Sequence, residues 1–180
     1  MKLRTERPGQ SATVGTGLTP PLSAADAGLL LLRLTVGLTM AGHGAQKLFG
    51  LFGGQGLEAT GKWFAHLGYE PGVFFAGLTG TSELLGGLGL ALGLFTPLAA
   101  AAVFGIMINA MAVDVGKGLW STSGGIEYPM TVAAVALAVA AVGPGRLSLD
   151  GRFPWRDGGW LPAAFVLCFG GLAAALVLVF

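Results

Sequence analysis

The feature that most constrains this chain is a series of five apolar segments, each long enough or nearly long enough to cross a lipid bilayer as a helix. They cover residues 27–49, 73–95, 98–115, 126–142 and 160–180. A bilayer core requires roughly 20 residues per helix, so the third and fourth segments are marginal in length. None of the segments alternates apolar and polar residues with a period of two, and a spanning sheet would have to close into a barrel. The sequence therefore predicts an all-α fold, a polytopic membrane helical bundle with a four-helix core and a fifth, C-terminal transmembrane helix.

The low content of charged residues argues against a soluble domain. Charged residues make up 11% of the 180-residue chain and hydrophobic residues 53%, whereas soluble domains carry roughly 25% charged residues. The formal net charge of +1 provides no basic field for nucleic acid, and the single cysteine, Cys168, cannot form an internal disulfide. Because the sequence has two histidines and scattered acidic residues, we expect no metal site built from protein ligands alone.

The chain is expected to have three regions. Residues 1–25 form a flexible polar tail that lacks the apolar core of a signal peptide, residues 26–150 form the main transmembrane bundle, and residues 151–180 form an inner loop and the fifth helix. Within residues 53–71, Trp63, Phe64 and Leu67 fall on one side of a helical wheel, which is typical of a short helix in the membrane interface. An ordinary loop with aromatic anchors is the alternative.

The distribution of Lys and Arg between the loops predicts the orientation of the chain in the membrane. With the N-terminus inside, the inner side holds Lys2, Arg4, Arg7, Arg146, Arg152 and Arg156, and the outer side or its rim holds Lys62, Lys117 and Lys47. The basic residues thus favour a cytoplasmic N-terminus. After five crossings the C-terminus is expected outside.

Polar residues inside the apolar segments are the candidates for a functional site. An ionisable group in hydrocarbon costs at least about 2.5 kcal/mol, so such groups usually face the bundle interior. Tracing the alternating helix directions places most of these residues in the outer half, with one deeper and one on the inner side. The candidate pocket comprises Arg33, His43, Lys47, Glu83, Asn109, Asp114 and Glu127. Two interpretations stay open: a pocket that handles protons or binds a ligand, and buried pairs that only fix helix register.

His43 and Glu83 are the candidate proton-handling residues. His43 and Lys47 are four residues apart in the sequence, which places them on one helix face about 6 Å apart along the axis. An imidazole titrates near neutrality, so with a carboxylate nearby it can exchange a proton with a quinone oxygen. A histidine that is merely hydrogen-bonded to a neighbouring helix fits the sequence equally well.

An ordered set of sequence blocks resembles the DoxX family of bacterial membrane proteins. The blocks are residues 32–34 (LRL), 43–48 (HGAQKL), 83–87 (ELLGG), 90–96 (LALGLFT), 124–129 (GGIEYP) and 143–150 (GPGRLSLD). The resemblance covers roughly residues 27–150 and implies a four-helix bundle in the bacterial plasma membrane. It includes neither the N-terminal tail nor the fifth segment. By resemblance, Arg33, His43, Lys47, Glu83 and Glu127 occupy the polar positions of the family.

The resemblance implies a role in membrane redox chemistry. Some relatives are the small membrane subunit of a thiosulfate:quinone oxidoreductase, and others are linked to membrane complexes that handle oxidative and thiol stress with soluble redox enzymes as partners. The sequence contains no recognisable haem or iron–sulfur ligand set. We therefore expect no covalently bound cofactor, and quinone is the candidate diffusible one. The sequence leaves open whether the chain is an enzyme subunit.

Other classes of function fit the sequence as well. One is a small transporter for a polar solute, although no inverted repeat is detectable. Another is a scaffold that anchors soluble enzymes through the tail and through Arg146, Arg152 and Arg156. A homo-oligomer is compatible with each of these functions.

Overall fold

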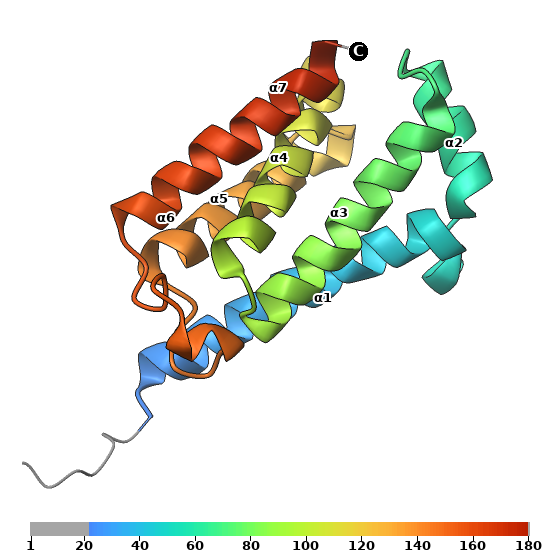
Figure 1. Cartoon of the computed structure of the whole chain (residues 1–180). Helices are drawn as coiled ribbons and strands as arrows, with labels where there is room; N and C mark the ends of the chain where they lie inside the picture. The colour runs from blue at the N-terminus through green and yellow to red at the C-terminus, as the bar shows by residue number, and fades with distance from the viewer. Residues whose placement is uncertain (1–21, 180) are drawn as a thin grey trace, which may run out of the picture.

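The computed structural model describes residues 22–179, and these residues form a bundle of helices without a β-strand (Figure 1). The helices are α1 (Ala24–Phe49), α2 (Gly56–His66), α3 (Gly72–Leu92), α4 (Thr96–Asp114) and α5 (Glu127–Val142). The C-terminal rod comprises α6 (Trp160–Phe165), a π-helical turn (Val166–Gly170) and α7 (Gly171–Val179). Short 3-10 turns lie at Leu51–Gly53, Val115–Lys117, Ser121–Ser123 and Leu149–Arg152. The predicted all-α class is confirmed.

Each predicted segment corresponds to a helix, but the helices differ in how well they match the membrane. Four helices in the described part of the chain are long and apolar enough to cross it: Ala24–Phe49, Gly72–Leu92, Thr96–Lys117 and Trp160–Val179. Helix α5 is apolar but has 16 residues, so it is about 24 Å long against a hydrocarbon core of about 30 Å. The short helix predicted between the first two segments is α2. The predicted tail, including Lys2, Arg4 and Arg7, lies outside the described residues up to position 21.

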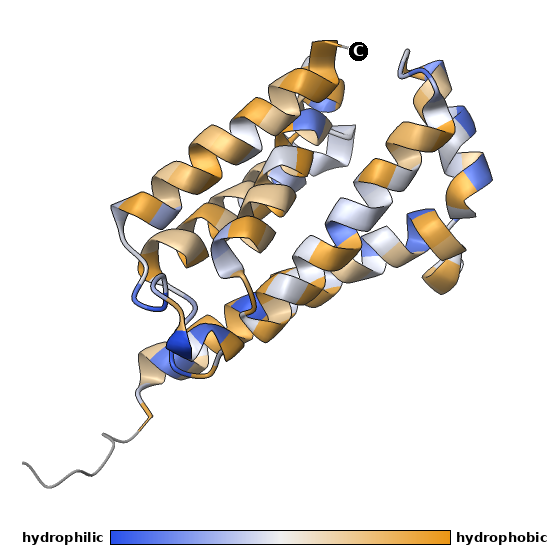
Figure 2. Ribbon diagram, viewed as in Figure 1, coloured by the Kyte–Doolittle hydropathy of each residue, from blue (hydrophilic) through white to orange (hydrophobic). Residues whose placement is uncertain are grey.

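The C-terminal rod is mostly hydrophobic, and hydrophilic residues are found mainly in α2, within α3 and in the loop before α6, as Figure 2 shows. Leu31 and Leu38 on α1, Leu85 on α3, and Leu172 and Leu176 on α7 are all more than half exposed. In water such a surface would be unstable, because each exposed leucine forfeits the free energy of burial. In a bilayer these side chains contact lipid. The chain is therefore a multi-pass membrane protein whose exposed leucines form its lipid-facing surface.

Close backbone approach at glycines holds the long helices together. A Cβ atom on Gly44 of α1 would lie 2.5 Å from the carbonyl oxygen of Gly80 in α3, and one on Gly105 of α4 would lie 2.8 Å from that of Gly170 in the C-terminal rod. Because lipid provides no hydrophobic drive for helices to associate, small residues that permit such contacts are the main source of packing energy. Helix α3 therefore packs directly along α1, and the C-terminal rod packs on α4 rather than standing apart.

One end of the bundle is held together by a buried arginine. We call this the arginine end; it comprises the start of α1, the turn between α3 and α4, and residues 143–159. Arg33 of α1 is 1% exposed, and its guanidinium donates hydrogen bonds to the carbonyl oxygens of Pro144, at 2.6 Å, and Leu147. The loop after α5 thus supplies backbone acceptors to a buried cation.

A buried aspartate completes the arginine end. Asp150 is fully buried, and its carboxylate accepts hydrogen bonds from the backbone N–H groups of Phe95, at 2.8 Å, and Thr96, at 2.7 Å. These N–H groups belong to the start of α4, which has no intrahelical acceptor for them. A carboxylate at a helix N-terminus is also favoured by the helix dipole. Asp150 therefore caps α4 and fixes the loop against the turn between α3 and α4.

The glycine contact between α1 and α3 predicts opposite effects for two neighbouring substitutions on α1. Gly44→Ala should lower the free energy of unfolding by about 1–3 kcal/mol, because its Cβ would collide with the α3 backbone. Gly42→Ala should be neutral or slightly stabilising, because its Cβ would meet no atom within 4 Å and alanine is the better helix former. Thermal unfolding in mild detergent measures both. Equal effects for the two variants would contradict the close approach.

Candidate functional site

A buried ion pair joins α1 to α3 near the middle of the bundle. The Lys47 ammonium lies 2.9 Å from Oε1 and 2.7 Å from Oε2 of Glu83. Glu83 is 3% exposed, whereas the Lys47 side chain retains 24% of its exposure. The close packing of α1 on α3 brings the two side chains together, so each charge offsets the desolvation of the other. A buried pair between helices, one of the two interpretations that the sequence left open, is thus present at these two residues.

The ion pair lies against a cavity of about 170 Å³. This cavity, which we call the lysine cavity, is bounded by α2, α3, α4 and the end of α7. Its polar lining residues are Lys47, Thr79, Glu83, Asn109 and Asp114, and its aromatic lining residues are Trp63, Phe64 and Tyr69. The lining therefore combines charged groups with flat apolar walls.

A second cavity, of about 310 Å³, lies on the other side of Lys47. It is bounded by the end of α1, the turn after it and α2, and its polar lining residues include Gln46, Gln55 and Thr60. Both cavities are lined by Lys47 and Trp63. These two side chains therefore separate the lysine cavity from the second, more open space.

Asn109, which lines the lysine cavity, has an unsatisfied acceptor buried next to it. Its Oδ1 atom is buried and has no hydrogen-bond partner among residues 22–179. A buried polar atom without a partner costs roughly 1–3 kcal/mol, and such atoms in native proteins call for an explanation such as a bound molecule.

His43 connects this region to α5. Its Nδ1 lies 3.1 Å from Oε1 of Gln46, and its Nε2 lies 3.1 Å from the hydroxyl oxygen of Tyr128, with the two rings in edge contact. His43 does not line the lysine cavity, but it is close enough to Glu83 to interact with its charge. The imidazole and the phenol are thus in direct contact between α1 and α5.

Of the remaining predicted site residues, Asp114 lies at the cavity and Glu127 and Arg33 lie elsewhere. Asp114 forms an exposed ion pair with Lys117 at 2.6 Å, at the rim of the lysine cavity. Glu127 accepts hydrogen bonds from the backbone N–H and the hydroxyl of Ser121, and so it closes the loop between α4 and α5. Arg33 lies at the arginine end and does not line the lysine cavity. The predicted pocket is therefore split between separate structural features.

Sequence reasoning missed several residues that matter to these features. Tyr128 lies in the sequence block at residues 124–129, but nothing in the sequence predicts a role for it. Trp63 and Tyr69 lie in the predicted interfacial segment, and the sequence does not place them at a cavity. Asp150 stands in the block at residues 143–150, where an acidic residue after Gly-Pro-Gly reads as an ordinary loop residue.

Within residues 22–179, no group of three or more His, Cys, Asp or Glu side chains is placed to hold a metal ion.

The fold and the cavity define the class of the protein: an α-helical, multi-pass membrane protein with a charged cavity among its helices. The DoxX family model matches residues 28–115, so this range is a DoxX domain, as the sequence blocks within it indicated. The matched range spans α1 to α4 and thus includes Lys47, Glu83 and Asn109. No curated protein and no solved structure matches the chain.

The buried pair predicts strong coupling between Lys47 and Glu83. Lys47→Met should lower the free energy of unfolding by about 3 kcal/mol, because Glu83 would be left buried without its partner. The further change Glu83→Met should restore much of this loss, since no lone charge would then remain. A detergent-titration double-mutant cycle measures the coupling.

The exposed pair between Asp114 and Lys117 is the matched control for this cycle. Lys117→Met should cost less than about 1 kcal/mol, because both side chains of that pair are solvated. If the losses of unfolding free energy from Lys47→Met and Glu83→Met were simply additive in the double variant, the buried ion pair would not be a stabilising contact.

Proposed function

We propose that the chain is a membrane subunit of a quinone-linked oxidoreductase or redox-stress system. In this proposal the lysine cavity holds the quinone head group, and a soluble redox enzyme supplies or accepts the electrons. The family match supports the membrane setting, and the proposal for the chemistry rests on the cavity. The single observation that carries it is an amphipathic cavity among the membrane helices, lined by the Lys47–Glu83 ion pair and by aromatic rings.

The lining of the cavity suits both redox states of a quinone. The oxidised ring is flat and apolar, with oxygen atoms that accept hydrogen bonds. The Lys47 ammonium is a donor for such an oxygen, and the rings of Trp63 and Tyr69 are flat surfaces beside it. The reduced form carries hydroxyl groups, for which the Glu83 carboxylate is an acceptor.

His43 and Tyr128 provide a route for protons in this proposal. Each electron taken up by a quinone is matched by one proton, so the site needs a connection to water. Tyr128 is 43% exposed and hydrogen-bonded to His43, which in turn interacts with Glu83. In this proposal a proton passes from the surface through the phenol to the imidazole, and water or the guest molecule carries it on to the carboxylate.

The single cysteine of the chain argues for a redox partner. Iron–sulfur clusters require several cysteine ligands, and Cys168 is exposed on the C-terminal rod. The electrons must then come from another protein or leave through it. This supports a subunit role rather than a self-sufficient enzyme.

We further propose that the arginine end faces the cytoplasm of the bacterial plasma membrane. Arg152 and Arg156 are exposed at this end, whereas Lys62 and Lys117 are at the opposite end. Basic residues are enriched in cytoplasmic loops. In this orientation α1 begins inside, α7 ends outside, and the lysine cavity lies in the outer half of the bundle.

Transport of a small polar solute is the second candidate function. It is favoured by the two cavities that meet at Lys47 and Trp63, since adjacent cavities can form part of a path. Purified chain in liposomes would then take up solute without quinone or partner. A quinone-binding subunit should show no such uptake.

The quinone proposal predicts a loss of binding in a variant that keeps its fold. The double variant Lys47→Met with Glu83→Met should bind a short-tailed benzoquinone at least about tenfold more weakly, because a hydrogen bond to a charged group contributes roughly 1.5–3 kcal/mol. Equilibrium binding to the purified chain in nanodiscs measures the affinity.

Glu58→Gln is the control, because Glu58 is an exposed carboxylate on α2 that lines neither cavity. It should bind the quinone as the unmodified chain does. If the double variant also kept full affinity, the lysine cavity would not be the quinone site.

A further inference from the structure

An apolar groove runs along the lipid-facing side of the α3–α4 pair, from mid-membrane to the arginine end. It consists of two hollows, of about 440 Å³ and about 560 Å³, which are both lined by Phe95 and Leu98. The first hollow lies between α3 and α4. The second continues between the start of α4, the loop before α6, and α6 itself. We call the whole feature the α3–α4 groove.

The shape of this groove suits an extended hydrocarbon chain. Its floor is formed where Gly86 and Gly89 of α3 contact Ala99 of α4, with a hypothetical Cβ on Gly89 only 2.8 Å from that of Ala99. Its walls include Leu85 and Leu92, which are 62% and 52% exposed. The lining of α3 from position 81 to position 92 corresponds to about 16 Å along the helix axis. Small residues below and leucines beside them thus leave a narrow apolar channel.

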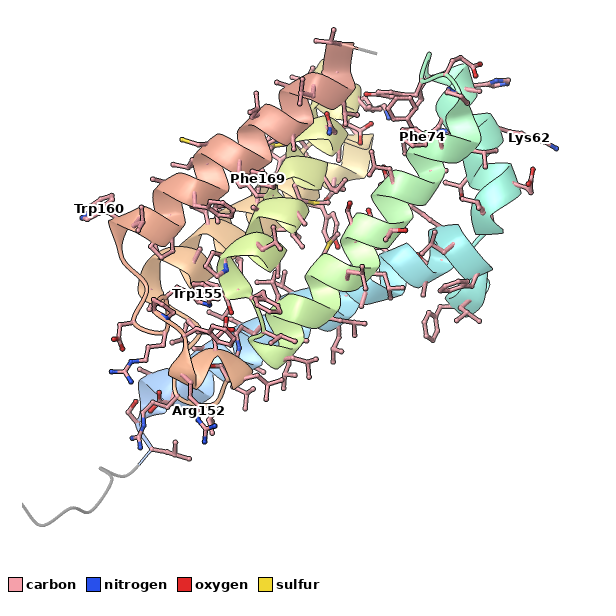
Figure 3. The ribbon with its side chains drawn as sticks, in the orientation of Figure 1. Lys62, Phe74, Arg152, Trp155, Trp160 and Phe169 are labelled. Atoms are coloured by element: carbon pink, nitrogen blue, oxygen red, sulfur yellow. The ribbon has the colours of Figure 1, made fainter. Side chains whose placement is uncertain are left out.

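The mouth of the groove has the chemistry of a membrane interface. Trp155 lines it, stacked on Phe153 with ring centroids 4.9 Å apart. Trp160, at the start of the C-terminal rod, is 93% exposed, and Arg152 projects from the same end of the bundle (Figure 3). Tryptophan and arginine side chains gather where lipid head groups begin. The groove therefore has a polar end at head-group depth and an apolar end in the hydrocarbon.

The charge at the mouth is positive. Arg152 and Arg156 are exposed in the loop that contributes Pro154 and Trp155 to the lining. Arg156 has an ion pair with Asp157 at 3.2 Å, but both side chains are more than half exposed, so this pair binds weakly and leaves the guanidinium accessible. A phosphate at the mouth would complement these two arginines.

We propose that the α3–α4 groove is a binding site for an anionic phospholipid of the leaflet that meets the arginine end. One acyl chain lies in the groove, and the phosphate lies beside Arg152 and Arg156. A quinone with an isoprenoid tail fits less well, because its polar head is neutral and the groove offers a cationic, rather than a hydroxyl-binding, end. A second copy of the chain fits less well too, because a two-fold contact would place the same positively charged patch on both sides of the interface.

Fluorescence quenching by brominated lipids tests this proposal without any quinone. With Trp63, Trp120 and Trp160 replaced by Phe, Trp155 alone reports on the mouth of the groove. Phosphatidylglycerol with brominated acyl chains should quench Trp155 at a lower mole fraction than brominated phosphatidylcholine does. The preference should fall by about fivefold for each arginine removed, because each contributes roughly 1 kcal/mol near an anionic surface.

Arg152→Gln with Arg156→Gln is the test variant, and Lys62→Gln at the other end of the bundle is its charge-matched control. Both changes are at exposed positions, so both chains should fold. The test variant should lose the preference for phosphatidylglycerol, and the control should keep it. The proposal is overturned if both lipids quench Trp155 equally while Arg152 and Arg156 are intact. It is also overturned if the preference for phosphatidylglycerol remains after both arginines are replaced. An absence of quenching by either lipid would also overturn it, because a protein partner or second copy then covers the groove.

Discussion

The contact between α1 and α3 is the constraint on which the polar half of the bundle depends. Gly44 and Gly80 let the two backbones approach so closely that no side chain fits between them. Three residues beyond each glycine, Lys47 and Glu83 then meet across the same seam at 2.7 Å. The glycines thus do more than pack the helices. They set the distance at which a lysine and a glutamate can neutralise each other in a medium that solvates neither.

The two ends of the bundle handle buried charge by different means. At the arginine end, Arg33 is paired with backbone carbonyl oxygens and Asp150 with backbone N–H groups, so each charge is matched by fixed dipoles of the loop and of α4. Such partners cannot reorient, and the result is a rigid junction. Near the other end, Lys47 and Glu83 are matched by each other beside a cavity. Side chains can exchange partners with a guest molecule, which backbone groups held in helices and turns cannot do.

The sequence predicted the helices well and the partners of the polar residues poorly, for physical reasons. Long apolar runs specify membrane helices locally, so all five segments correspond to helices, and α5 differs only in being short. The position of each charge along its helix also follows from helix geometry. This geometry places Arg33 and Lys47 far apart along α1, as they are in the structure. The partner of a charge depends instead on how helices pack and where loops return. Glu127 was expected at the depth of the cavity, yet its carboxylate accepts a hydrogen bond from Ser121 instead. Asp150 becomes a helix cap only because residues 143–150 fold back onto the start of α4.

The cavity also extends beyond the part of the chain that carries the family match. That match ends at residue 115, but Val177 of α7 lines the lysine cavity and Tyr128 of α5 binds His43. The C-terminal rod reaches this position because Gly105 and Gly170 allow it to lie directly on α4. Residues 28–115 therefore supply the charged groups, whereas α5 and α7 supply part of the enclosure and the neighbour of the imidazole. Selectivity for a guest molecule would then be set in part by helices outside the matched range, since the enclosure decides which shapes can reach the same charges.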